Sequence, residues 1–78
     1  MEEILKLVIE NLVANKDSIS IKSTEENDIV KVTVSVPREE MGRVIGRQGK
    51  IARSIRTLMK SIASKARKKI DIEFVEAD

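Results

Sequence analysis

Two glycines three positions apart, Gly46 and Gly49, have the type and spacing that point most directly to a chemistry. Arg47 and Gln48 lie between them, and Lys50 follows. Because glycine lacks a β-carbon, it adopts backbone conformations closed to other residues and lets a ligand approach the main chain. Since the neighbouring charges are positive, the ligand that this segment suggests is an anion.

A G-x-x-G pattern alone is weak, because a glycine that ends a helix, followed by a turn glycine, gives the same letters without a ligand. The basic neighbours favour the anion hypothesis. Arg47, Lys50 and Arg53 surround the expected amino end of a long helix, where each cation costs a few tenths of a kcal/mol up to about 1. A bound phosphate would turn these repulsions into attractions, and free N–H groups at a helix start also bind phosphate. We therefore expect this end to bind a nucleic-acid backbone.

Two nucleotide-binding motifs are excluded by spacing and context. A Walker A loop needs G-x-x-x-x-G-K-[ST] after a strand, but here Lys50 is followed by Ile51 and a helix is expected before the loop. A Rossmann turn needs G-x-G-x-x-G directly after a strand, and Gly42, Gly46 and Gly49 do not have that spacing.

Catalysis is not indicated either. The chain has no histidine and no cysteine, which removes the commonest general base and the thiolate metal ligand. The adjacent carboxylates Glu39 and Glu40 are explained by the positive end of a helix that starts there. We expect no catalytic residue, no metal site and no cofactor.

Charge is divided unevenly along the 78 residues. Residues 38–69 contain eleven Lys/Arg and two Asp/Glu, whereas the rest contains four and eleven. A segregated basic half is typical of a polyanion binder, although a solvated helix face rich in lysine and arginine gives the same count. No apolar run approaches the roughly 18 residues of a membrane span. We expect residues 1–78 to form a single cytoplasmic domain without membrane association.

Hydrophobic periodicity gives the elements that must position the loop. Three segments have a helical period: residues 2–15, 38–45 and 50–67. Three segments alternate as strands: residues 18–23, 30–36 and 70–74. A polar turn at 24–28 joins the first two strands. The order α-β-β-α-α-β predicts an α+β fold, in which a three-stranded mixed sheet carries all three helices on one face.

This order, together with the segment from Val44 to Ile51, resembles a KH domain of the type II arrangement. The length, the Gly42–Gly46 segment and Ile55-Arg56-Thr57 resemble the small bacterial KhpA family. The resemblance covers nearly the whole chain. It implies RNA binding without enzyme activity, and pairing with a second copy or with a larger partner that has its own KH domain.

KH loops clamp the backbone of about four nucleotides. The resemblance implies these RNA-binding residues: Arg43, Val44, Ile45, Gly46, Arg47, Gln48, Gly49, Lys50, Ile51 and Arg53. The four loop residues would contact phosphates, two following cations would neutralise them, and Arg43 would flank the groove. The three aliphatic residues would form a floor for bases, with an ordinary core role as the equal alternative.

The only aromatic residue is Phe74, so we expect no stacking platform, weak sequence preference and clear salt dependence. Single-stranded RNA is the ligand that the resemblance implies, and the residues alone leave single-stranded DNA open. The expected role is an RNA chaperone or a post-transcriptional regulator. The alternative is a protein-interaction module that acts through a KH-containing partner, with RNA binding secondary.

A second surface is expected on the long helix. Its apolar stripe runs from Ile51 to Ala66, and Leu58 lies at one edge. Small uncharged residues flank this leucine: Ser54, Thr57 and Ser61. Such a face suits helix–helix association in a homodimer or in a heterodimer with a related domain. A leucine at the edge of an ordinary core is the alternative.

Overall fold

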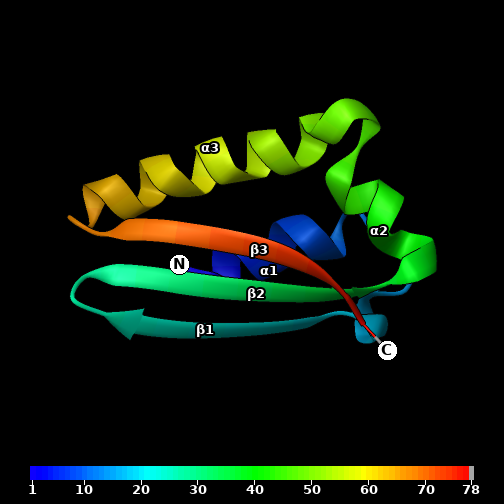
Figure 1. Ribbon diagram of the computed structural model, residues 1–78, viewed down its shortest axis with the longest axis horizontal. Helices are drawn as coiled ribbons and strands as arrows, with labels where there is room; N and C mark the ends of the chain where they lie inside the picture. Colours follow the sequence, from blue (N-terminus) through cyan, green and yellow to red (C-terminus); the bar gives the residue numbers. More distant parts are fainter. Residues whose placement is uncertain (78) are drawn as a thin grey trace.

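The computed structural model describes residues 1–77. Its helices and strands follow in the order α1 (Glu2–Glu10), β1 (Ser20–Glu26), β2 (Ile29–Pro37), α2 (Arg38–Ile45), α3 (Lys50–Lys65) and β3 (Lys69–Ala77) (Figure 1). Two short 3-10 turns, Lys16–Ser18 and Arg47–Gly49, precede β1 and α3. The predicted α-β-β-α-α-β order of the type II KH arrangement is confirmed.

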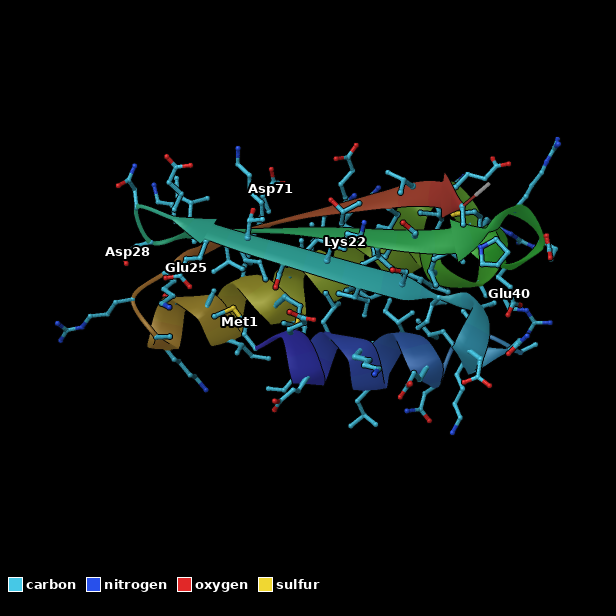
Figure 2. The ribbon with its side chains drawn as sticks, turned by 90° about the horizontal axis from the view of Figure 1, so that it is seen from below. Met1, Lys22, Glu25, Asp28, Glu40 and Asp71 are labelled. Atoms are coloured by element: carbon cyan, nitrogen blue, oxygen red, sulfur yellow. The ribbon has the colours of Figure 1, made fainter. Side chains whose placement is uncertain are left out.

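The three strands form one mixed sheet in the order β1-β2-β3. β1 runs antiparallel to β2, while β3 runs parallel to β2 after the crossover through α2 and α3. The helices lie on one face of this sheet, as Figure 2 shows for α1 and α3, and Asp71 lies on the opposite face. The mixed sheet with its helices on one face is therefore confirmed as well.

The core lies between the sheet and the helices. Alternation along β2 turns its valines inward and Lys31, Thr33 and Ser35 outward, because successive side chains of a strand point to opposite faces. The buried apolar residues come from all six elements except β1, with one more from the segment after α1: Leu5, Ile9, Val13, Val30, Val32, Val34, Val36, Val44, Ala52, Ile55, Met59, Ala63, Ile70 and Ile72. Each fully buried large aliphatic side chain contributes about 1.5–3 kcal/mol, so this layer fixes how α2 and α3 are held.

α1 is shorter than the periodicity predicted. It ends before Asn11, whose side-chain amide donates to the Leu7 carbonyl at 2.7 Å. Leu5 and Ile9 are buried, whereas Ile4 and Leu7 are 43% and 61% exposed. The apolar arc of this helix is wider than the surface that the sheet covers. Ile4 and Leu7 are among the apolar residues that give this segment its helical period, but they remain exposed.

α3 also ends before its predicted position, because Arg67 takes a left-handed φ of 58°. The Lys68 N–H donates to the Ala63 carbonyl and the Arg67 N–H to the Ser64 carbonyl, both at 2.9 Å. These two bonds make a Schellman motif, which satisfies the last carbonyls of the helix. Ala66 lies beyond the end of α3 and is exposed, so its placement in the apolar stripe was wrong.

The hairpin between β1 and β2 is tighter than predicted. Only Asn27 and Asp28 form its turn, with φ of 53° and 64°, as in a type I′ turn. Thr24, expected in the turn, instead pairs with Lys31 across the two strands. Since β1 is an edge strand, its polar side chains remain in solvent while its backbone pairs with β2. For this reason the polar residues 24–26 were predicted to lie in the turn although they belong to the strand.

Candidate nucleic-acid interface

α2 and α3 meet at the loop of residues 46–49. The Gly46 N–H donates to the Gly42 carbonyl at 2.9 Å, and the Gly49 N–H donates to the Gly46 carbonyl at 3.1 Å. Gly46 has φ 76° and ψ 173°, a conformation essentially restricted to glycine. Gln48 and Gly49 are left-handed, with φ of 57° and 74°. The loop is thus a tight turn that joins the end of α2 to the start of α3.

The two glycines are required for different reasons. A β-carbon on Gly46 would lie 2.6 Å from Cγ1 of Ile51, closer than real β-carbons approach any atom. A β-carbon on Gly49 would meet nothing within 4 Å. Packing and backbone conformation together require glycine at 46, whereas only backbone conformation favours it at 49. The open space beside Gly49 leaves room for a ligand.

The amino end of α3 differs from those of the other two helices. The first turns of α1 and α2 each contain two glutamates, whereas the first turn of α3 contains no acid. Arg47, Lys50 and Arg53 are all exposed around this end. The Arg53 Nη2 donates to the Gln48 carbonyl at 3.3 Å, which holds its guanidinium beside the loop. These cations face the positive end of the helix dipole, and a bound anion would relieve that repulsion.

Arg43 is tied to a neighbour instead of the loop. Its Nε lies 3.1 Å from Oε1 of Glu40, a carboxylate that is buried. The other oxygen of Glu40 accepts a hydrogen bond from the Asn15 N–H at 2.9 Å. Glu40 therefore anchors the segment after α1 to α2. Sequence reasoning missed this role, since nothing local connects residues that are 25 positions apart.

The three aliphatic candidates separate into two kinds. Val44 is fully buried in the core, so its prediction as a base-contacting residue is corrected to a core role. Ile45 and Ile51 are half-buried and pack against the core while keeping part of their surface accessible. Of the three candidates, Ile45 and Ile51 therefore offer an aliphatic surface beside the loop.

The predicted second surface is exposed on α3. Ser54, Thr57, Leu58 and Ser61 are all exposed, and their spacing places them on one side of the helix. Leu58 is 45% exposed. The hydroxyls of Ser54 and Thr57 each donate at 3.0 Å to the carbonyl four residues earlier. Because these hydroxyl donors are satisfied within α3, covering this face would leave neither of them unpaired.

Arg56 is held against β3. Its guanidinium carbon lies 5.4 Å from the centroid of the Phe74 ring, and its Nε donates to the Ile72 carbonyl at 3.2 Å. The guanidinium thus covers part of β3 and holds this side of α3 against the strand. The pairing joins residues far apart in the chain, so no local signal predicted it.

Within residues 1–77, no group of three or more His, Cys, Asp or Glu side chains is placed to hold a metal ion. None of the helices described here is long and apolar enough to cross a membrane.

Comparison with known proteins identifies the family. The family model described as KhpA/KhpB, KH domain, matches residues 2–74. The chain belongs to the KhpA/KhpB KH-domain family. The RNA-binding protein KhpA of Listeria monocytogenes is 41% identical over 97% of this chain and 100% of its own length. The proteins of the same name from Caldanaerobacter subterraneus and Aquifex aeolicus are each 36% identical, over 96% and 97% of this chain and 100% and 96% of their own lengths.

Proposed function

We propose that this protein binds single-stranded RNA through the loop of residues 46–49, as a non-catalytic KhpA-type module. The observation that carries the proposal is the amino end of α3, which is ringed by Arg47, Lys50 and Arg53, has no acid in its first turn, and lies beside the open space at Gly49. Membership of the KhpA/KhpB KH-domain family supports the proposal, because the similar proteins from three bacteria are named RNA-binding proteins.

In this proposal, phosphates of about four nucleotides lie against the loop. Backbone N–H groups and the Gln48 amide donate to phosphate oxygens, and the three cations neutralise the charge. Ile45 and Ile51, which are half-buried, support the bases from below. Arg43 has a lesser part, since Glu40 already neutralises much of its charge.

Binding of this kind depends on salt and only weakly on base sequence. The single aromatic ring, Phe74, is partly buried and has the Arg56 guanidinium over it, so it offers no exposed platform for stacking. For single strands, the logarithm of the affinity falls by about 0.7 per neutralised phosphate for each tenfold rise in salt. With three cations engaged, we expect a slope of about −2. A cytoplasmic RNA chaperone or post-transcriptional regulator suits such broad recognition.

Gly49 offers a direct test of the loop. Asp and Asn have nearly the same shape and both tolerate the left-handed backbone, and a side chain at this position meets no neighbour. Gly49→Asp places a negative charge where a phosphate is proposed, whereas Gly49→Asn does not. We expect Gly49→Asp to weaken RNA binding at least tenfold more than Gly49→Asn, equivalent to about 1.4 kcal/mol, in fluorescence anisotropy at low salt.

The same titrations decide between RNA binding and the alternative function. Equal RNA affinities for Gly49→Asp and Gly49→Asn, with both variants folded by circular dichroism, would remove the loop from the binding site. If the wild-type chain shows no salt-dependent RNA binding, the protein-interaction module becomes the better account. Gly46→Asp is avoided in this test, because its side chain would collide with Ile51.

We also propose that the face of Leu58 associates with a second KH domain, either a copy of this chain or a larger KH-containing protein. The supporting observation is an exposed leucine beside two hydroxyls whose donors are already paired within α3. None of the four residues of this face is charged: they are Ser54, Thr57, Leu58 and Ser61.

A further inference from the structure

Gln48 has the least favourable backbone conformation of the loop for its residue type. Its φ is 57° and its ψ is 25°, a left-handed conformation that a residue with a β-carbon disfavours. Gly46 and Gly49 also have positive φ, but glycine adopts it without a steric cost. A strained conformation persists only where the surrounding structure holds it. The contacts around Gln48 therefore show what keeps the loop in its shape.

The peptide group between Gln48 and Gly49 is held from both sides. Its N–H, which belongs to Gly49, donates to the Gly46 carbonyl at 3.1 Å. Its carbonyl, which belongs to Gln48, accepts a hydrogen bond from Nη2 of Arg53 at 3.3 Å. Among residues 1–77, Arg53 is the one side chain that hydrogen-bonds to the backbone of the loop. The orientation of this peptide group thus depends on a side chain from the first turn of α3, directly after the loop (Figure 1).

Arg53 can hold the loop and still bind a phosphate. A guanidinium has five N–H donors in a rigid planar arrangement, and the Arg53 side chain uses one of them within residues 1–77. No carboxylate of these residues lies within 4.0 Å of its nitrogens, so its charge is not neutralised. A lysine at this position would keep the charge, but its compact ammonium ends a side chain that is one atom shorter. The two roles of Arg53 can therefore be separated by substitution.

We infer that Arg53 is a positioning residue: its hydrogen bond to the Gln48 carbonyl keeps the loop in the form that binds RNA before the RNA arrives. The inference rests on the proposed function and gives Arg53 a role besides the neutralisation of phosphate. A loop that already has its bound form loses less conformational entropy on binding. When only a fraction of the molecules has the competent form, the apparent affinity falls by that fraction.

The test uses substitutions that change the shape of the side chain with or without its charge. Arg53→Lys keeps the charge and removes the guanidinium, whereas Arg53→Gln removes both. Arg38→Lys is the matched control, since Arg38 is exposed at the start of α2 and makes no ion pair among residues 1–77. Each variant is titrated with a mixed-sequence single-stranded 8-mer RNA by fluorescence anisotropy at several salt concentrations. Solvent exchange of the Gly49 N–H is measured by NMR without RNA.

We expect Arg53→Lys to weaken RNA binding about fivefold with the salt slope unchanged at about −2, as when about one fifth of the molecules keep the competent loop. Arg53→Gln should bind still more weakly, and its slope should be smaller by about 0.7, the effect of one lost phosphate contact. The Gly49 N–H should exchange several times faster in Arg53→Lys than in the wild type. Arg38→Lys should match the wild type in both measurements.

Wild-type affinity and wild-type Gly49 exchange in Arg53→Lys would overturn the positioning role and leave the loop proposal in place. A change in only one of these two measurements, or an equal effect of Arg38→Lys, would overturn it in the same way. A wild-type chain that binds no RNA would overturn the proposed function and with it the role of Arg53 in RNA binding, whatever the exchange of the Gly49 N–H shows.

Discussion

Gly46 and Ile51 lie in direct contact across the turn between α2 and α3. A β-carbon at position 46 would be 2.6 Å from Cγ1 of Ile51 and 2.9 Å from its Cβ and Cδ1. Ile51 itself packs against the core, so it cannot withdraw without disturbing the first turn of α3. The contact therefore fixes the end of α2 relative to the cations of the proposed RNA site.

The first prediction concerns the unequal roles of the two loop glycines. Gly46→Ala combines a backbone conformation that costs about 1–3 kcal/mol with overpacking that costs a similar amount. Gly49→Ala meets open space and incurs only the left-handed strain of about 1–2 kcal/mol. Urea unfolding should therefore show a clearly larger loss of stability for Gly46→Ala. Equal losses would show that the contact with Ile51 relaxes freely.

The second prediction concerns the buried carboxylate of Glu40. Glu40→Ala removes the hydrogen bond from the Asn15 N–H and the ion pair with the Arg43 guanidinium, and a hydrogen bond to a charged group contributes about 1.5–3 kcal/mol. Glu39→Ala, in the same turn of α2 but exposed, is the matched control and should cost no more than about 1 kcal/mol. In a domain of this size, 1 kcal/mol shifts the Tm by about 4–8 °C, so thermal unfolding by circular dichroism separates the two variants. Similar Tm values would contradict the anchoring role.

The third prediction concerns the end of α3. Arg67 occupies the left-handed position of the Schellman motif, with φ 58°, where glycine is the usual residue. Arg67→Gly should raise the free energy of unfolding by about 1 kcal/mol, whereas Arg67→Ala retains the strain and should leave it nearly unchanged. Both variants remove the same charge. The difference between their free energies of unfolding in urea therefore reports the backbone strain at position 67. If the Gly variant is no more stable than the Ala variant, the left-handed backbone at position 67 carries no such strain.

These positions show where sequence reasoning succeeded and where it failed in the fold. The alternation from Val30 to Val36 predicted a strand with one buried face because burial follows side-chain period directly. The ends of elements were less predictable. Asn27, Asp28 and Arg67 reverse the chain with positive φ at positions without glycine, so the usual signal for such a conformation was missing.

The candidate site also has features that the sequence predicted and features that it did not. Arg47, Lys50 and Arg53 were predicted together because they follow one another within a loop and one helical turn, so sequence neighbours are also neighbours in space. By contrast, the Arg56 guanidinium lies over the Phe74 ring only because the chain turns back from α3 into β3. For Val44 the sequence left a core role and a base-contacting role as equal alternatives, because a short apolar segment beside a loop has the same pattern whether it faces the core or a ligand, and the structure places it in the core.

The last prediction concerns association through Leu58. In a two-fold dimer the same patch is used by both chains, so Leu58→Lys removes two buried leucines at once. Leu58 is 45% exposed, so covering the remainder of one leucine contributes about 0.7–1.4 kcal/mol. With two leucines, the dimer dissociation constant should rise about tenfold or more. Sedimentation equilibrium should show wild-type dimers at high concentration and monomers for the variant. A larger KH-containing partner, where present, should lose affinity for the variant in the same way.

Leu7→Lys is the matched control, because Leu7 is more exposed than Leu58 but lies on α1. It introduces the same charge and removes the same apolar side chain from a different face. If Leu7→Lys prevents association as strongly as Leu58→Lys, a general rise in net charge is the cause and the α3 face is not the interface. If the wild-type protein stays monomeric at high concentration and Leu58→Lys changes nothing, the homodimer proposal is contradicted. Only the experiment with the larger KH-containing partner would then test the heterodimer.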